Sequence, residues 1–184
     1  MQRFTVEPTP LRGLVCVQRK RLEDARGFFS RLFCAEELAA AGWQGPVAQI
    51  NHTWTRQRGA VRGLHFQHAP HAEDKLVSCL RGEVFDVAVD LRRGSPTLLR
   101  WHGERLSASN GRALLIPRGF AHGFQTLSDD CEMLYLHSSR YEPQAEGALN
   151  IHEPRLGISW PLPVAELSAR DAAHPYLDPA FSGI

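Results

Sequence analysis

Two histidines stand in sequence contexts that suit acid–base chemistry by an imidazole group. His122 ends the pattern Gly-x5-Pro-x-Gly-x2-His, which begins at Gly111. In this pattern a glycine closes a turn, an apolar strand follows, and the Pro-x-Gly turn brings the histidine onto the next strand. His65 lies earlier, in the segment Arg-Gly-Leu-His-Phe-Gln at residues 62–67. The unperturbed pKa of imidazole is about 6.5, so either histidine suits general-base work near neutral pH. For His122, a plain hairpin with an incidental histidine is the alternative.

The residues around His65 argue against a tightly bound catalytic metal. Two histidines placed two residues apart on a strand share one face, and both can then bind one ion. The second of these positions is Gln67, and an amide oxygen is a poor substitute for imidazole on a transition metal. His71 and Glu73 lie in a loop-like segment without strand spacing. We therefore predict no metal at this site, and a metal-dependent enzyme is the alternative.

Three further residues would complete a site for removing a proton next to a carbonyl group. Asp171 would orient the imidazole, Lys75 would stabilise the enolate oxygen, and the phenol of Tyr135 would return a proton to the opposite face. Each also has an ordinary interpretation: a solvated strand start for Lys75, a core position for Tyr135 and a turn or helix cap for Asp171. The sequence has no Rossmann or Walker glycine pattern that would indicate a nucleotide cofactor, and we predict none.

The elements that must position these residues are short β-strands separated by turn signals. Such a succession is typical of an all-β sandwich or barrel. Within residues 84–91, Phe85 and Val87 alternate with Asp86 and Ala88, which predicts one apolar face and one face suited to a functional side. The predicted strands cover residues 60–67, 75–80, 83–91, 98–106, 112–116, 123–127 and 132–137.

The ends of the chain differ from this middle part. Residues 34–41 are rich in helix formers and stop at Gly42, which predicts one short helix. From Pro143 onward prolines are frequent, and we expect irregular chain wrapped over the barrel. We predict a single domain of residues 1–184, with N-terminal strands and a helix in 1–45, the barrel core in 46–140 and a C-terminal wrap in 141–184.

Composition restricts the classes of partner. The formal net charge of the 184 residues is +1, which gives no electrostatic argument for nucleic acid or an anionic membrane. No apolar stretch approaches the roughly 20 residues of a membrane helix. The N-terminus lacks the apolar region of a signal peptide, and the four cysteines form no C-x-x-C pair. We therefore expect a cytoplasmic protein that binds neither nucleic acid nor membrane.

Taken together, the motifs around His65 and His122 and several other segments of the sequence resemble those of the dTDP-4-dehydrorhamnose 3,5-epimerases, a family of deoxysugar and polysaccharide biosynthesis. The pattern that ends at His122 also matches the second signature of the cupins, the fold of that family. The resemblance covers roughly residues 1 to 176, in the order of the family. It rests on the segments at residues 24–29, 49–51, 62–67, 75–77, 82–92, 94–97, 116–124, 134–135, 141–143, 158–161 and 167–171.

The resemblance implies an all-β, double-stranded β-helix (cupin) barrel with a few short helices. It also implies a cofactor-independent isomerase acting on a nucleotide-diphosphate 4-keto-6-deoxy sugar. His65 resembles the base, Asp171 its partner, Lys75 the group facing the enolate and Tyr135 the acid. Members of the family are usually homodimers whose N-terminal part reaches the neighbouring site. The implied substrate-binding residues are Arg26, Phe28, Gln49, Asn51, Arg62, His122 and Tyr141.

Two positions depart from the family pattern, and several outcomes stay open. Arg31 replaces the usual glutamate after the Arg-Gly-Phe-Phe motif, which leaves the nucleotide base undecided, and Arg170 replaces a lysine. Inversion at C3 alone or at C5 alone, on this or another nucleotide-linked keto sugar, is one alternative to inversion at both carbons. A metal-dependent cupin enzyme and a non-catalytic nucleotide-sugar binding module are the others.

Overall fold

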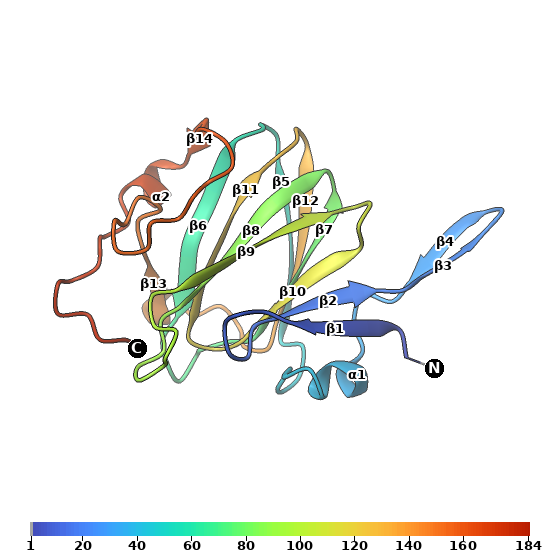
Figure 1. Ribbon diagram of the computed structural model, residues 1–184, viewed down its shortest axis with the longest axis horizontal. Helices are drawn as coiled ribbons and strands as arrows, with labels where there is room; N and C mark the ends of the chain where they lie inside the picture. Colours follow the sequence, from blue (N-terminus) through green and yellow to red (C-terminus); the bar gives the residue numbers. More distant parts are fainter. Residues whose placement is uncertain (1) are drawn as a thin grey trace.

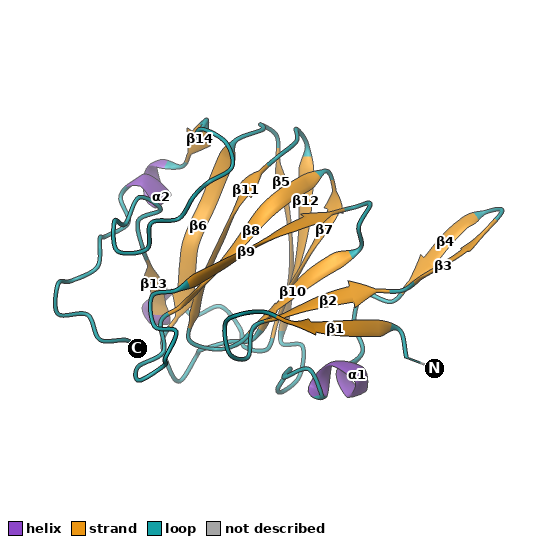
Figure 2. Cartoon of the chain, in the orientation of Figure 1, coloured by secondary structure: helices purple, strands orange, loops and turns teal. Residues whose placement is uncertain are grey.

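The computed structural model describes residues 2–184, which consist mainly of β-strands (Figure 2). The helical elements are α1 (Ala35–Ala39), the 3-10 turn η1 (Pro143–Ala145) and α2 (Ala169–Ala172). None of the helices in these residues is long and apolar enough to cross a membrane. The strands are β1 (Phe4–Pro8), β2 (Val15–Arg19), β3 (Arg21–Asp24), β4 (Gly27–Ser30), β5 (Gln49–Thr55), β6 (Ala60–Gln67), β7 (Lys75–Arg81), β8 (Glu83–Asp90), β9 (Trp101–Ser107), β10 (Arg112–Ile116), β11 (Phe120–Thr126), β12 (Cys131–His137), β13 (Glu146–Ala148) and β14 (Glu166–Leu167).

Two six-stranded sheets face each other and form a jelly-roll barrel (Figure 1). The first sheet has the order β1-β2-β10-β7-β12-β5, and the second has the order β13-β6-β11-β8-β9 with β14 also paired to β6. Every pairing is antiparallel except that of β14 with β6. The predicted cupin barrel with a few short helices is therefore confirmed.

Three apolar layers explain why both faces of many strands are hydrophobic. The first layer lies between the sheets and includes Val77 and Met133 from one sheet and Phe124 from the other. The second lies on the outer face of the second sheet, where Leu149 and the rest of the C-terminal segment cover it. The third lies on the outer face of the first sheet, under α1 and the following turn. The alternation in β8 follows from this arrangement, because Val87 and Val89 pack under the C-terminal segment while Asp86 faces the barrel interior.

Several predicted boundaries differ from the structure. The strand predicted from residue 98 begins at Trp101, because residues 95–100 form consecutive turns that include Leu99 at a φ of 63°. The predicted helix is shorter and spans Ala35–Ala39. The C-terminal segment is less irregular than we predicted, because it contributes β13, β14 and α2. The division of the single domain into three parts stays a prediction.

Gly63 lies where β6 and β11 are too close together for a side chain. A Cβ atom at this position would be 2.6 Å from the Cα of Gly123 and 2.9 Å from the carbonyl oxygen of His122. The φ of Gly63 is also positive, at 129°, which favours glycine. The close approach of the two strands places His65 directly opposite His122 as paired residues. The close approach of the two strands and the positive φ therefore explain why this position of the Arg-Gly-Leu-His segment holds a glycine.

Candidate active site

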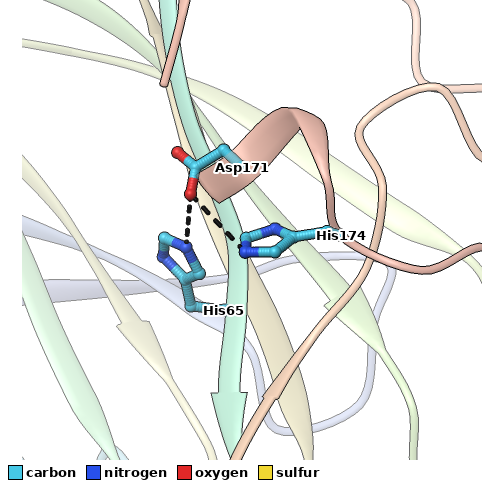
Figure 3. A group of neighbouring side chains, drawn as sticks. All are labelled: His65, Asp171 and His174. Atoms are coloured by element: carbon cyan, nitrogen blue, oxygen red, sulfur yellow. Dashed lines mark hydrogen bonds and ion pairs between the residues drawn. The ribbon is translucent and has the colours of Figure 1, made fainter. Parts of the chain in front are cut away.

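His65 and Asp171 form a hydrogen-bonded pair (Figure 3). The pair lies beside a cavity of the barrel. Strand β6 carries His65, and α2 brings Asp171 to it across 106 residues of sequence. Nε2 of His65 lies 3.0 Å from Oδ1 of Asp171, and the backbone N–H of Gly63 donates to Oδ2 at 3.3 Å. The Ser168 hydroxyl caps α2 by accepting a hydrogen bond from the N–H of Asp171 at 3.0 Å. Strand and cap together fix the geometry of the pair.

The environment keeps Asp171 ionised. Burial alone would raise the pKa of its carboxyl group, but the hydrogen bond and charge of His65, together with the Gly63 N–H, bring the pKa below its usual value. With the His65 Nε2–H directed at this carboxylate, the lone pair of the neutral imidazole is on Nδ1. The His65 side chain is 35% exposed, so the ring is accessible. A buried carboxylate that orients an accessible imidazole is suited to general-base catalysis.

A second imidazole, that of His174, lies beside His65 and faces the same carboxylate oxygen of Asp171 (Figure 3). Its Nε2 is 3.6 Å from the same Oδ1, and its ring meets the His65 ring edge to face, with centroids 5.1 Å apart. The pKa of His174 is lowered, mainly by burial and to a smaller extent by the charge of the neighbouring His65. The sequence analysis missed this residue. The Asp-x-x-His spacing was the available signal, since residues three apart on a helical turn share a face.

Tyr135 and His122 occupy the interior of the barrel near this pair. The Tyr135 hydroxyl is 3.2 Å from Oγ1 of Thr53, and its ring centroid is 6.0 Å from that of His122. Burial strongly raises the pKa of Tyr135, so the phenol keeps its proton. Nε2 of His122 lies 2.9 Å from Oδ2 of Asp86, which is fully buried. Asp86 was noticed in the sequence only as part of a polar strand face.

Lys75 belongs to a buried polar network that the sequence analysis did not predict. Its Nζ is 3.1 Å from Oε1 of Glu73, and Nδ1 of His137 is 3.3 Å from Oε2 of the same carboxylate. Burial tends to raise the pKa of Glu73, but His137 and Lys75 lower it overall. The Gln67 amide donates to Glu73 Oε2 at 2.9 Å, and its oxygen accepts from the Glu142 N–H at 2.7 Å. Gln67 therefore anchors the loop that carries Glu73.

These groups surround one cavity of about 330 Å³, which is large enough for part of a small ligand. All four predicted catalytic residues line it. So do four of the predicted binding residues, Asn51, Arg62, His122 and Tyr141. Gln49 lies just outside, where its amide donates to Asn51 and accepts from the N–H of Tyr141. The lining residues that the sequence analysis did not select include Thr53, Glu73, His137, Glu146, Ser168 and Arg170.

Two predicted binding residues lie away from this cavity. Arg26 and Phe28 belong to the β3–β4 hairpin, which projects from the barrel (Figure 1). Arg26 pairs with Asp24, and Phe28 is 59% exposed. Within one chain the structure therefore does not bring them to the site, because the hairpin pairs only with itself and extends outward. Arg31, at the departure from the family pattern, pairs instead with Glu37 of α1 at 2.6 Å.

Comparison with known proteins decides the family. The family profile described as dTDP-4-dehydrorhamnose 3,5-epimerase matches residues 8–179. The chain belongs to this family. The dTDP-4-dehydrorhamnose 3,5-epimerase of Salmonella typhimurium is 45% identical over 177 residues, which cover 94% of this chain and 95% of that protein.

Solved structures of epimerases agree with this assignment. The enzyme of Legionella pneumophila, in complex with dTDP-4-keto-L-rhamnose, has a TM-score of 0.89 at 40% identity and covers 94% of this chain and 92% of that one. A 3'-monoepimerase from Streptomyces bikiniensis, in complex with dTDP-quinovose, has a TM-score of 0.84 at 36% identity, with 92% and 86% covered. The protein is therefore an epimerase of the cupin fold.

Proposed function

We propose that this epimerase inverts C3 and C5 of a dTDP-linked 4-keto-6-deoxy sugar by removing and returning protons. The hydrogen-bonded pair of His65 and Asp171, beside a cavity that also holds Lys75 and Tyr135, carries this proposal. Both carbons flank the C4 ketone, so one enolate chemistry serves both positions. The family supplies the class of reaction, and the side chains around the cavity match the steps that the reaction needs.

The steps follow from the chemistry of the four residues. Nδ1 of His65 takes the proton from the carbon next to the ketone, and the electron pair of that C–H bond moves into the enolate. Asp171 stabilises the resulting imidazolium. The Lys75 ammonium, 8% exposed and held by Glu73, stabilises the negative charge on O4. Tyr135 then donates its proton to the opposite face of the carbon, the electrons return to the C4 carbonyl, and the configuration is inverted.

We further propose that the nucleotide end is bound by the residues at the rim of the cavity. Arg62 is exposed, and its guanidinium is oriented by the Thr55 hydroxyl, with Nε to Oγ1 at 2.9 Å. A planar guanidinium suits the oxygens of a pyrophosphate. Asn51, Gln49 and Tyr141 form a hydrogen-bonded group beside it and would contact the sugar or the base. Relatives solved with dTDP-sugars support dTDP as the carrier.

The remaining predicted residues fit a homodimer in which the hairpin reaches the site of the partner. Phe28 and Phe29 are each 59% exposed on a hairpin that projects from the barrel. Apolar side chains exposed in this way indicate an interaction surface. We expect sedimentation to show a dimer and Phe28→Ala to raise KM for the dTDP-sugar more than it lowers kcat. A stable, fully active monomer would contradict this part of the proposal.

Proton exchange with deuterated water tests the function directly. The enzyme is incubated with dTDP-4-keto-6-deoxyglucose in deuterated water, and NMR follows the signals at C3 and C5. We expect deuterium at both carbons and inverted product. No exchange at either carbon, with this sugar or with its UDP, GDP and CDP analogues, would refute the epimerase mechanism.

Inversion at C3 alone is the second candidate function. The observation that favours it is the similarity to a 3'-monoepimerase, which is 36% identical over most of both chains. In that case deuterium appears at C3, the C5 proton signal persists, and only the C3 epimer accumulates. The same NMR experiment therefore separates the two candidates.

A further inference from the structure

We propose that His65, Asp171 and His174 form a binding site for a divalent transition ion such as Zn²⁺, and that the bound ion inhibits the epimerase. One ligand atom from each residue lies within 4.8 Å of the other two. Figure 3 shows the two imidazoles directed at the same carboxylate oxygen. Strand β6 supplies His65, and α2 with the following turn supplies the other two.

The separations of the donor atoms fit a tetrahedral ion. Zinc binds imidazole and carboxylate at about 2.0–2.1 Å, so two ligand atoms in tetrahedral geometry lie about 3.3 Å apart. The two Nε2 atoms lie 3.0 Å and 3.6 Å from Oδ1 of Asp171, on either side of that value. All three donor atoms lie within 4.8 Å of one another, so an ion would bind among them once the side chains turn their lone pairs from Oδ1 toward a shared centre.

The donor types select the class of ion. Two imidazoles and one carboxylate suit Zn²⁺, Ni²⁺ or Cu²⁺, whereas Mg²⁺ and Ca²⁺ prefer oxygen ligands. The Gly63 N–H holds the other carboxylate oxygen, Oδ2, and thereby leaves Oδ1 facing the imidazoles. Nδ1 of His174 is buried with no hydrogen-bond partner among the described residues, so its proton would stay unpaired in the complex. We therefore expect micromolar affinity rather than the tight binding of a structural site.

The ion can reach the site through the substrate cavity. Asp171 is buried and the His174 side chain is only 8% exposed, but the His65 side chain is 35% exposed and lines the cavity. Three basic and three acidic side chains line the same cavity and balance in formal charge, so a cation meets no net repulsion. These side chains are Arg62, Lys75, Arg170, Glu73, Glu146 and Asp171.

Binding would inhibit because it removes the free lone pair of His65. When an ion replaces the proton on Nε2, the neutral imidazole must carry its proton on Nδ1. Neither ring nitrogen can then accept a proton from the sugar. This inhibitory consequence rests on the proposed role of His65 as the base, whereas binding of the ion does not.

The experiment titrates the metal-free protein with Zn²⁺ against a chromogenic chelator and measures the epimerase rate at each free zinc concentration. We expect one zinc per chain and inhibition that EDTA reverses. His174→Gln should weaken binding at least about tenfold and relieve inhibition to the same extent, since loss of even an outer partner costs about 10–100-fold in affinity. His68→Gln, a nearby exposed histidine outside the cluster, should leave both unchanged.

His174→Asn serves as a second variant, and circular dichroism checks that each variant is folded. Zinc binding to His174→Gln with wild-type affinity would overturn the site. Zinc binding without inhibition of an active enzyme, or activity that EDTA abolishes and zinc restores, would overturn the inhibitory role. Zinc binding that depends on His174, in a protein without epimerase activity even in EDTA, would support the site while refuting the proposed function.

Discussion

Two histidine–aspartate pairs lie side by side in this barrel, and they differ in what surrounds them. His65 and His122 are directly paired across β6 and β11, and each directs Nε2 at a carboxylate, at 3.0 Å and 2.9 Å. The His65 side chain is 35% exposed, whereas that of His122 is 7% exposed. The partner of His65 comes from the C-terminal helix, and that of His122 comes from the adjacent strand β8. The same two residue types therefore give an accessible imidazole in one place and a buried imidazole in the other.

Replacing each histidine in turn should reveal the largest difference between the two pairs. We expect His65→Ala to lower turnover by about 10²–10⁴-fold, the usual contribution of a general base. His122→Ala should lower it much less, because we expect the buried His122, paired with Asp86, to shape the pocket rather than to take the proton. Deuterium exchange at C3 and C5 measures both variants. Equal losses of turnover in the two variants would show that both histidine–aspartate pairs contribute to catalysis.

Neutralising the carboxylate of Asp171, the partner of the accessible His65, should have the next largest effect on turnover. Asp171→Asn keeps the shape of the side chain but removes the charge that stabilises the imidazolium, and we expect kcat to fall by about 10²-fold or more. KM should change little, since we expect Asp171 to act through its hydrogen bond to His65. Steady-state kinetics with the dTDP-sugar measure this split. Wild-type kcat in the folded variant would exclude Asp171 as the partner of the base.

The corresponding change in the buried pair should act on stability instead. Asp86→Asn leaves His122 facing an amide inside the barrel, and we expect the free energy of unfolding to fall by about 1–3 kcal/mol, the cost of a disturbed buried hydrogen bond. The effect on kcat should stay below tenfold. Urea unfolding and steady-state kinetics on the same sample test both statements. A large loss of kcat at unchanged stability would show that Asp86 takes part in catalysis rather than in stability.

Asp90, another acidic residue of β8, should make the stability of the protein depend on pH. Hydrogen bonds from Arg92, Ser95 and Thr97 outweigh burial and lower the pKa of Asp90 from 3.8 to about 2. Because the pKa is lower in the folded state, Asp90 stabilises the protein above about pH 4, and this contribution disappears as the pH falls through about 2. We expect Asp90→Asn to cost about 1–2 kcal/mol of unfolding free energy at pH 5. Urea unfolding should show that the difference in unfolding free energy between Asp90→Asn and wild type shrinks toward pH 2. A difference that stays constant with pH would contradict a role of the lowered Asp90 pKa.

The sequence predicted much of the fold because barrel strands have strong local signals. The strands at residues 112–116 and 132–137 match β10 and β12 closely, since turns bound both and their hydrophobic residues fill two apolar layers. The start of β9 was misplaced because residues 95–100 form turns that depend on contacts with Asp90 rather than on local pattern.

The site was less predictable from residue types alone. The pair of His65 and Asp171 is separated by 106 residues, so no local pattern could show that the two side chains meet. Glu73 lies in a loop whose path depends on hydrogen bonds with Gln67, so no spacing rule indicated its contact with Lys75. Phe28 belongs to the β3–β4 hairpin, which projects from the barrel (Figure 1), and within one chain it does not line the cavity.

The short cap at Ser168 ties the geometry of the site to a segment far along the chain from His65. His65 is made long before Asp171, and the same C-terminal segment seals the outer apolar face of the second sheet. An unfinished or proteolytically trimmed chain would carry its imidazole with nothing to hold the ring in one tautomer. On the proposed mechanism, activity therefore requires the C-terminal segment to fold onto the second sheet.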